Sequence, residues 1–146
     1  MRSEPADPHD LQRFVAAQAP VYAQARAELA RGRKESHWMW FIFPQLKELG
    51  RSETARRYGI ASSAEARAYL AHSLLGPRLI DCTRLMLVVQ GKSALDVLGA
   101  PDDLKFRSSM TLFAELAGPT SAFADALRKF FAGERDAKTQ ELLSPR

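Results

Sequence analysis

The positions of the glycines constrain the fold of this chain more than any other feature. Seven of the eight glycines each follow a stretch compatible with a helix and precede a polar or proline-containing break. A glycine just past a helix end adopts the left-handed backbone conformation that other residues avoid. Between these glycines the apolar residues recur at a spacing close to that of a helix, with no alternating strand pattern. The sequence therefore predicts one compact all-α domain of about eight helices over residues 1–146. The glycines in question are Gly32, Gly50, Gly59, Gly91, Gly99, Gly118 and Gly133.

Capping residues indicate where several of these helices begin. Asp10 has a side chain that can cap the first helix. Ser62 and Glu65 have the spacing of a capping box, which predicts a helix directly after Ser62. Proline is favoured in the first turn of a helix, so we expect two long helices to begin at Pro77 and Pro101.

Composition excludes several classes of protein. No apolar run approaches the roughly 18 residues that a membrane span needs, so no membrane association is expected. The first residues are polar and acidic, without the apolar core of a signal peptide. A single cysteine, Cys82, excludes an intramolecular disulfide and fits a reducing cytoplasm, where we expect the protein. Residues 1–9 and 144–146 flank the predicted helices and are expected to be flexible.

The charge of the chain is moderately basic. It carries 21 basic and 17 acidic residues, a formal net charge of +4 at pH 7. A nucleic-acid-binding protein usually concentrates its charge on one face or carries a recognised module, and no such module is found. Nucleic acid is therefore not the expected partner. Two small clusters, Arg31–Lys34 and Arg56–Arg57, remain candidates for binding phosphate.

The aromatic segment 37–45, with the sequence HWMWFIFPQ, holds both tryptophans and six consecutive apolar residues. Such a run must be buried, and we predict a short buried helix that ends near Pro44, although local propensity alone would favour a strand. Polar residues frame the run: Lys34, His37 and Gln45. Aromatic residues with polar groups at their edge occur both in protein cores and in small-molecule pockets. The residue pattern leaves both interpretations open.

A second segment, 101–113, also places polar residues in apolar surroundings. Asp102, Lys105 and Ser109 fall on one face of the predicted helix, beside its apolar side. The hydroxyls of Ser108 and Ser109 are costly inside an apolar helix unless they find partners. They either bond back to helix carbonyls or line a polar cavity with Lys105 and Asp102. A lysine and an aspartate one turn apart most often form an ion pair that stabilises the helix.

Metal and cofactor chemistry have little support in the sequence. The three histidines and Cys82 show no spacing of metal ligands, and no glycine-rich phosphate loop is present. We therefore expect neither a metal nor a cofactor. Cys82 lies on the predicted buried face of its helix, which is typical of a small buried hydrophobe rather than of a nucleophile.

Three segments together resemble one bacterial family, catalogued as domain of unknown function 1810. They are the aromatic segment 37–45, the stretch 63–79 and the stretch PDDLKFRSSMTLF at 101–113, and the resemblance covers about residues 10–143. It implies an all-helical cytosolic domain and implies no activity. The label "calpastatin" sometimes given to such proteins does not fit, because calpastatin acts through disordered repeats. In general shape alone, the chain also resembles the family that hydrolyses N-glycosidic bonds of ADP-ribose-type compounds.

We predict a small-molecule site, for a nucleotide-like or ADP-ribose-like compound, between the 34–45 aromatic segment and the 101–113 helix. Hydrolysis of an N-glycosidic bond is its candidate reaction, with His37, Asp102 and Lys105 as the catalytic residues. The predicted ligand-binding residues are Lys34, Trp38, Trp40, Gln45, Arg56, Arg57, Ser108 and Ser109.

The alternative is a non-enzymatic protein-interaction module whose aromatic segment is only core. This alternative predicts that both tryptophans are fully buried and that an apolar patch is exposed elsewhere. Tyr58, Tyr69 and Leu74–Leu75 are the candidates for such a patch. The sequence indicates no particular oligomeric state.

Overall fold

The computed structural model describes residues 6–144, and over that range the chain forms helices and no strand. Of the ends predicted to be flexible, residues 1–5 and 145–146 lie outside the described residues. The helices, in chain order, are α1 (Gln12–Gln18), α2 (Tyr22–Arg31), α3 (Met39–Ile42), the 3-10 helix η1 (Lys47–Leu49), α4 (Glu53–Arg57), α5 (Ser63–Ala71), α6 (Leu75–Leu87), α7 (Ala94–Leu98), α8 (Asp102–Ala117), α9 (Ala122–Phe131) and α10 (Ala137–Leu143).

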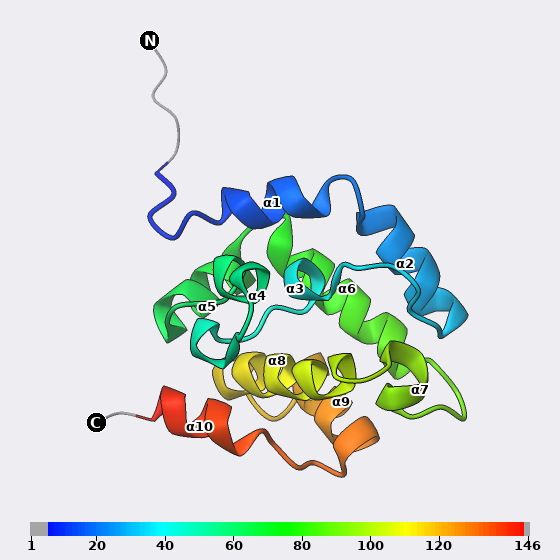
Figure 1. The fold of residues 1–146 in the computed structure, drawn as a ribbon. Coiled ribbons are helices and arrows are strands. Elements are labelled where there is room, and N and C mark those ends of the chain that lie inside the picture. Colours follow the sequence, from blue (N-terminus) through cyan, green and yellow to red (C-terminus); the bar gives the residue numbers. More distant parts are fainter. Residues whose placement is uncertain (1–5, 145–146) are drawn as a thin grey trace.

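These helices form a single compact all-α domain, as predicted (Figure 1). Within residues 6–144 there are ten α-helices, more than the predicted number of about eight. Three of them, α3, α4 and α7, are short helices of four or five residues. None of the helices formed by the described residues is long and apolar enough to cross a membrane.

Helix α8 lies at the centre of the domain. It packs against α5, α7, α9 and α10, while α6 packs against α2, α5 and α9 (Figure 1). From Ser108 to Ala114 every residue of α8 is buried, so this helix has no solvent-facing side along its middle. The aromatic segment joins this centre through Phe43, whose ring meets the ring of Phe106 edge-on at 4.9 Å between centroids. The segment is therefore part of the core through Phe43.

The first helix is capped by a different aspartate from the one predicted. The carboxylate of Asp7 accepts hydrogen bonds from the backbone N–H groups of Leu11 and Gln12, at 2.8 and 2.9 Å. These hydrogen bonds lower the pKa of Asp7, with the one from Gln12 the stronger cause. Asp10 instead adopts a left-handed backbone with φ of 50°. The left-handed backbone of Asp10 turns the chain into α1, and its side chain does not cap the helix.

The predicted capping box at the start of α5 forms only in part. The hydroxyl of Ser62 accepts the N–H of Glu65 at 3.1 Å, as expected of a cap. Glu65, however, does not bond back to the N–H of Ser62. Its carboxylate pairs with Arg13 at 2.7 Å, with both side chains largely buried. A tertiary ion pair thus replaces the second half of the local motif.

The long helix predicted to begin at Pro77 begins two residues earlier, at Leu75. The ring nitrogen Nδ1 of His72 accepts hydrogen bonds from the N–H groups of Leu74 and Leu75, at 3.1 and 3.2 Å. Gly76 follows, and a Cβ at this position would lie 2.1 Å from the carbonyl oxygen of Leu70. The close approach of α5 and α6 therefore requires glycine here, and the histidine serves as the N-terminal cap.

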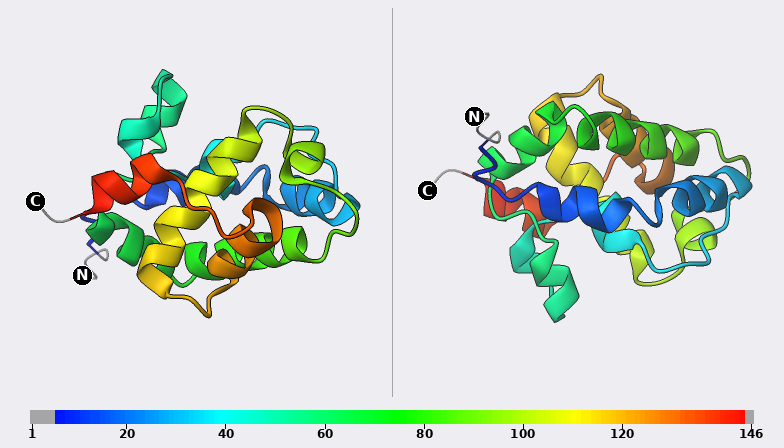
Figure 2. Two further views of the ribbon diagram at one scale, coloured as in Figure 1. Left: turned by 90° about the horizontal axis from the view of Figure 1, so that it is seen from below. Right: turned by 90° about the horizontal axis from the view of Figure 1, so that it is seen from above.

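The stretch from Gln45 to Ile60 leaves the body of the domain and returns to it. It is closed at its base by an isolated parallel bridge between Leu46 and Ile60. The N–H of Lys47 donates to the carbonyl of Ile60 at 2.8 Å, and the N–H of Ile60 donates to that of Gln45 at 2.9 Å. Helix α4 projects from the rest of the molecule in both views of Figure 2. Only Ala55 of this helix is buried.

Candidate functional site

The first tryptophan of the aromatic segment is a core residue. Trp38 is fully buried, and its indole N–H donates to the carboxylate of Glu28 at 2.9 Å. The same carboxylate accepts the backbone N–H groups of Glu35 and Ser36 at 2.8 Å each, the Ser36 hydroxyl at 2.5 Å and the amide of Gln24 at 2.8 Å. Burial by itself raises the pKa of Glu28. The hydrogen bonds outweigh that effect and hold the pKa well below its ordinary value.

The second tryptophan has different surroundings. Trp40 is only partly buried, and the ammonium of Lys105 lies 5.5 Å from the centre of its ring. Its indole nitrogen Nε1 is shielded from solvent, yet it has no hydrogen-bond partner among residues 6–144. A buried N–H donor without an acceptor is costly, so this group calls for a water molecule or a ligand atom beside it. Trp40 and Lys105 both line a small cavity of about 10 Å³, roughly the space of one water molecule.

Asp102 connects the aromatic segment to α8 through two lysines. Its carboxylate lies 3.0 Å from the ammonium of Lys34 and 3.7 Å from that of Lys105. The side chain of Lys34 is 9% exposed, and its ammonium also lies 5.2 Å from the ring centre of Trp38. Lys105 is more open, at 29%. The contact to Lys34 is within hydrogen-bonding distance and the contact to Lys105 is not, so Lys105 has donors to spare.

A groove of about 570 Å³ opens beside these residues, between the 45–55 stretch and the start of α8. Gln45 and Lys105 line both this groove and the small cavity next to Trp40. The groove also contains Ser108 and the apolar Leu104, which is 53% exposed. Four basic side chains line it, against one acidic side chain, Asp136. They are Arg51, Lys105, Arg107 and Lys138.

Arg107 is the most constrained of these basic side chains. Its guanidinium lies 3.7 Å from the carboxylate of Glu134 and 3.9 Å from that of Asp136, both beyond hydrogen-bonding distance. Its Nε is buried and has no partner within the described part of the chain. The guanidinium is therefore held only loosely by its two carboxylates. Sequence reasoning missed this residue and Asp136, because the residues of α10 that complete the groove are distant in sequence.

The structure thus brings together some of the predicted site residues and separates others. Gln45 and Lys105 line both the groove and the small cavity, Trp40 lines the cavity and Ser108 lines the groove. Asp102 lies beside Lys105 and pairs with Lys34. His37 is exposed and lines neither hollow. Arg56 and Arg57 are exposed on another side of α4, where they line a different hollow.

The predicted polar residues of α8 are largely satisfied within the helix. The hydroxyl of Ser108 donates to the carbonyl of Leu104 at 3.2 Å. That of Thr111 donates to the carbonyl of Arg107 at 2.8 Å. Both hydrogen bonds follow the interpretation in which these side chains bond back to the helix. Ser109 is fully buried, and its hydroxyl oxygen has no partner within residues 6–144.

Glu28 is the residue that sequence reasoning missed most completely. A glutamate in an alanine-rich helix is typical of an exposed helix face, and no local signal marks Glu28 as buried. The only available hint is that a buried tryptophan needs an acceptor for its N–H. The structure shows that this acceptor lies ten residues before Trp38 in the sequence.

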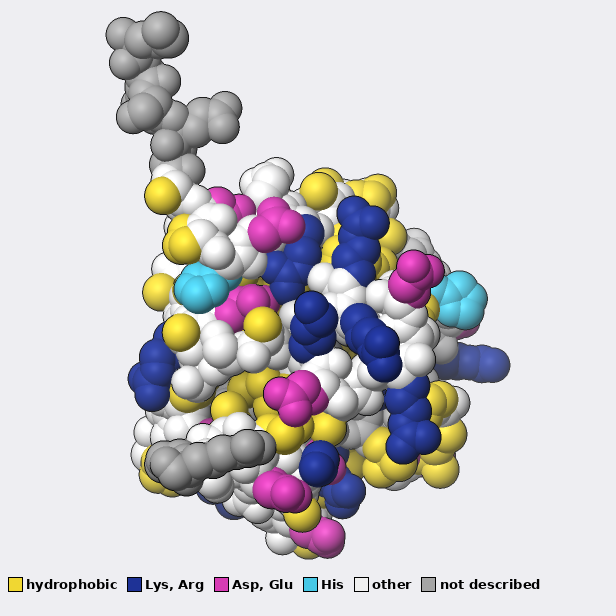
Figure 3. All heavy atoms as spheres, turned by 60° about the vertical axis from the view of Figure 1, so that its left-hand side comes forward, with side chains coloured by type: hydrophobic (Ala, Val, Ile, Leu, Met, Phe, Trp, Pro, Cys, Tyr) yellow, Lys and Arg dark blue, Asp and Glu magenta, His cyan; other side chains and the backbone are white. Residues whose placement is uncertain are grey.

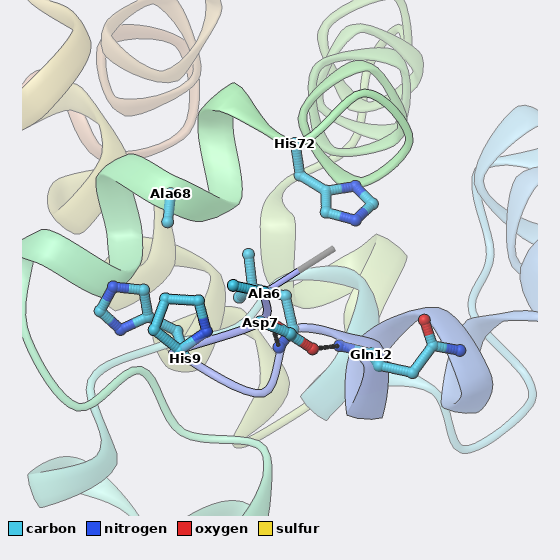
Figure 4. A pocket seen from close by; sticks show the side chains of 8 residues that line it. Ala6, Asp7, His9, Gln12, Ala68 and His72 are labelled. Atoms are coloured by element: carbon cyan, nitrogen blue, oxygen red, sulfur yellow. Dashed lines mark hydrogen bonds between the residues drawn. The ribbon is translucent and has the colours of Figure 1, made fainter. Parts of the chain in front are cut away.

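Another hollow, of about 760 Å³, lies beside the N-terminal stretch (Figure 4). It is lined by residues 6–9, Leu11 and Gln12, together with Ala68 and His72 of the α5 region. None of the predicted site residues contributes to it. Two of its polar side chains have structural roles, since Asp7 caps α1 and the ring of His72 accepts N–H groups at the start of α6.

Cys82 is buried, as its place on α6 predicted. Burial, helped by the nearby carboxylate of Asp81, raises the pKa of its thiol to about 12. A thiol with such a pKa is not a nucleophile near neutral pH. Across the described residues, no group of three or more metal-ligating side chains lies close enough to hold an ion.

The predicted apolar interaction patch is wrong in part, because Tyr69 and Leu75 are fully buried.

Comparison with known proteins identifies the family. The model of a family described as "Protein of unknown function (DUF1810)" matches residues 8–143. The crystal structure of the conserved hypothetical protein Rv1873 from Mycobacterium tuberculosis is 54% identical in sequence, with a TM-score of 0.92. The match covers 96% of this chain and 100% of that one. No curated protein matches the chain. The chain therefore belongs to the DUF1810 family, as the three sequence segments predicted.

Proposed function

We propose that this protein binds a small anionic molecule, of nucleotide or ADP-ribose type, in the groove between the Gln45 end of the aromatic segment and α8. The observation that carries the proposal is the position of Lys105. This lysine lines both the groove and the small cavity beside Trp40, and its ammonium has a loose ion pair to Asp102 and a cation–π contact with the ring of Trp40. A cation with free donors at two adjacent hollows is suited to an anionic ligand.

The size and lining of the groove support this assignment. A volume of about 570 Å³ falls within the range of small-molecule sites. The excess of basic side chains favours an anion, while Leu49, Pro101 and Leu104 supply an apolar wall for a ring or another apolar part. The unpartnered Nε of Arg107 and Nε1 of Trp40 are donors that a ligand atom or a water would satisfy.

Binding has better support than catalysis. The proposed N-glycosidic hydrolysis needs a carboxylate that faces the bond to be broken. Asp102 is the candidate, because it stands directly behind Lys105, but it does not line the groove. His37, the other predicted acid or base, is exposed outside the groove. Hydrolysis therefore remains a proposal that depends on Asp102 alone.

The alternative, a protein-interaction module, has less support. Three large apolar side chains are exposed among the described residues: Val88, Leu95 and Leu104. Leu104 lines the groove. Val88 is the C-terminal cap of α6 and Leu95 lies in α7, so they belong to different helices. A continuous apolar patch would be the usual mark of a protein interface.

A thermal-shift screen tests the binding proposal. The purified protein is heated with AMP, ADP, ADP-ribose and NAD, in parallel with Lys105→Gln and Arg84→Gln. A ligand at 100 times its dissociation constant should stabilise the protein by about 2.7 kcal/mol. We expect this shift to vanish in Lys105→Gln and to persist in Arg84→Gln, which removes an exposed arginine of α6. The proposal fails if no compound shifts the midpoint, or if Lys105→Gln responds like the wild type.

A product assay on the same samples tests hydrolysis separately. Each compound that binds is incubated with the protein, and released base or nicotinamide is measured by chromatography. Loss of product in Asp102→Asn, with binding retained, would assign the reaction to this carboxylate. Binding without product would leave the protein a binder and remove the hydrolase proposal.

A further inference from the structure

A second basic hollow lies on the other side of α4 from the groove. It has a volume of about 420 Å³ and is formed where η1, α4 and the start of α5 meet the approach to α1. It shares no lining residue with the groove. Figure 3 shows this side of the molecule, where lysine and arginine side chains gather in a band across the middle and right of the view.

The floor of this hollow is rigid. The guanidinium of Arg13 donates to the carbonyls of Arg57 and Gly59, at 2.8 and 2.9 Å, and to the carboxylate of Glu65 at 2.7 Å. Two further hydrogen bonds run to the carbonyls of residues 9 and 10. Arg13 therefore uses its donors to fasten three segments together, and it neutralises Glu65. Arg13 therefore has a structural role, and the positive charge at the edge of the hollow comes from other residues.

The rim of the hollow carries three cations that have no acidic partner. Lys47, Arg56 and Arg57 are exposed, and none of them forms an ion pair within the described part of the chain. The Nε of Arg56 makes one long hydrogen bond, 3.4 Å, to the carbonyl of Gly50. Asp10 is the one acidic side chain of the lining that is not paired with Arg13, so the rim keeps a net positive charge.

Two of these cations have a simpler structural explanation, and the third does not. Arg56 and Arg57 end α4, where basic residues interact favourably with the helix dipole. Lys47 belongs to η1 and gains nothing from that dipole. Its backbone is held against Gly59, where a Cβ would lie 2.4 Å from the Cα of Lys47. The close contact with Gly59 thus fixes the backbone of Lys47 beside the hollow.

We propose that this hollow is a separate binding site for a compound with adjacent phosphate groups. Three cations against one free carboxylate favour a ligand with at least two negative charges. Guanidinium groups bind phosphate through paired hydrogen bonds, and Lys47 adds a point charge beside them. The rigid floor lowers the entropic cost of holding these groups together. The groove has an apolar wall for a ring, whereas this hollow selects mainly for charge.

The test uses inorganic pyrophosphate as the probe. The ¹⁵N-labelled full chain is titrated at constant ionic strength, and amide shifts are followed by NMR. We expect shifts confined to residue 47 and residues 56–60. The dissociation constant should rise about ten-fold in Arg56→Gln/Arg57→Gln and several-fold in Lys47→Gln. Lys47→Gln leaves α4 untouched, so it separates loss of binding from loss of that helix.

Two controls make the result decisive. Arg33→Gln/Arg84→Gln removes two exposed arginines elsewhere and should bind pyrophosphate like the wild type. Lys105→Gln should also bind normally, because it affects only the groove, so the two sites can fail independently. Absence of shifts, shifts spread over all basic residues, or equal weakening in the control double variant would overturn the proposal. The proposal would also be overturned if this face bound oligonucleotides tightly and in a salt-sensitive way but did not bind pyrophosphate. The hollow would then be part of a nucleic-acid-binding surface.

Discussion

Trp38 and Trp40 lie two residues apart and have opposite surroundings. Trp38 is fully buried, its N–H is bonded to Glu28, and the nearby Lys34 is held at 3.0 Å by Asp102. Trp40 is partly buried, its N–H has no partner among the described residues, and the nearby Lys105 is 3.7 Å from the same carboxylate. One half of the segment is therefore locked by complete hydrogen bonding, and the other half has donors left over at a cavity.

The comparison shows how one short segment can serve both the core and a site. A fully satisfied polar network adds rigidity and cannot give up a bond without cost. An incompletely satisfied group can accept a new partner at little cost. We call Trp38 with its partners Glu28 and Lys34 the inner half, and Trp40 with its neighbour Lys105 the outer half. Changes in the inner half should lower stability, and changes in the outer half should lower ligand binding.

The largest effect is expected from Glu28→Ala. This change removes the acceptor of five hydrogen bonds and leaves buried donors unsatisfied, including the N–H of Trp38. The free energy of unfolding should fall by about 3 kcal/mol or more. Urea unfolding followed by circular dichroism measures it. Glu35→Ala is the matched control, since Glu35 is exposed and makes only a 3.8 Å ion pair with Arg31, so it should cost about 0.5 kcal/mol at most.

The same carboxylate should make stability depend on pH. The pKa of Glu28 in the folded protein is held below its ordinary value of 4.5, so the unfolded chain takes up the proton first as the pH falls. Its contribution is therefore fully present above that ordinary pKa and is lost progressively below it. Urea midpoints measured between pH 6 and pH 3 should fall less steeply in Glu28→Gln than in the wild type. If the wild type and Glu28→Gln lose stability equally steeply as the pH falls, the pKa of Glu28 is not lowered in the folded protein.

A smaller difference should separate the two tryptophans. Trp38→Phe removes a buried hydrogen bond to Glu28 and should cost about 1–3 kcal/mol. Trp40→Phe removes an N–H that has no partner within residues 6–144, so stability should stay within about 0.5 kcal/mol of the wild type. Any ligand found by thermal shift should bind Trp40→Phe more weakly than the wild type. In the wild-type protein, the same ligand should change the tryptophan fluorescence. Equal destabilisation by the two changes would remove the distinction between inner and outer halves.

The smallest expected difference is between the two lysines of Asp102. Lys34→Met removes a mostly buried ion pair with a 3.0 Å contact and should cost about 1–2 kcal/mol. Lys105→Met removes a looser contact of 3.7 Å and should cost about 0.5 kcal/mol at most. Thermal unfolding at low and at high salt measures both. A larger cost for Lys105→Met would mean that its charge is structural and would weaken the proposed binding role.

Local sequence signals predicted a large part of the fold. Ser62 caps α5 as predicted, and Ser52, Ser93 and Ser121 cap the helices that follow them in the same way. The buried position of Cys82 followed from helical periodicity. Local signals failed where a distant partner competed with them: Glu65 is paired with Arg13, which lies 52 residues before it, and Asp7 replaced Asp10 as a cap.

The candidate site was predictable only in outline. Spacing along a helix put Asp102 and Lys105 on one face, and the aromatic segment was expected to lie close to them. Spacing could not show that Arg56 and Arg57 face a different hollow, because that depends on how the stretch 45–60 leaves the body and returns. Nor could it show that Arg107 and Asp136 border the groove, because α10 approaches α8 only in the folded chain.

The sequence by itself determined the helical class, the family and most helix boundaries, since periodicity, caps and glycine stops act over a few residues. Only the tertiary structure decided which polar groups have partners. The indole N–H of one tryptophan meets a carboxylate and that of the other meets no acceptor among the described residues, and this depends on packing between α2, the aromatic segment and α8. Partners are set by distances across the fold, and the candidate sites lie where those partners are missing.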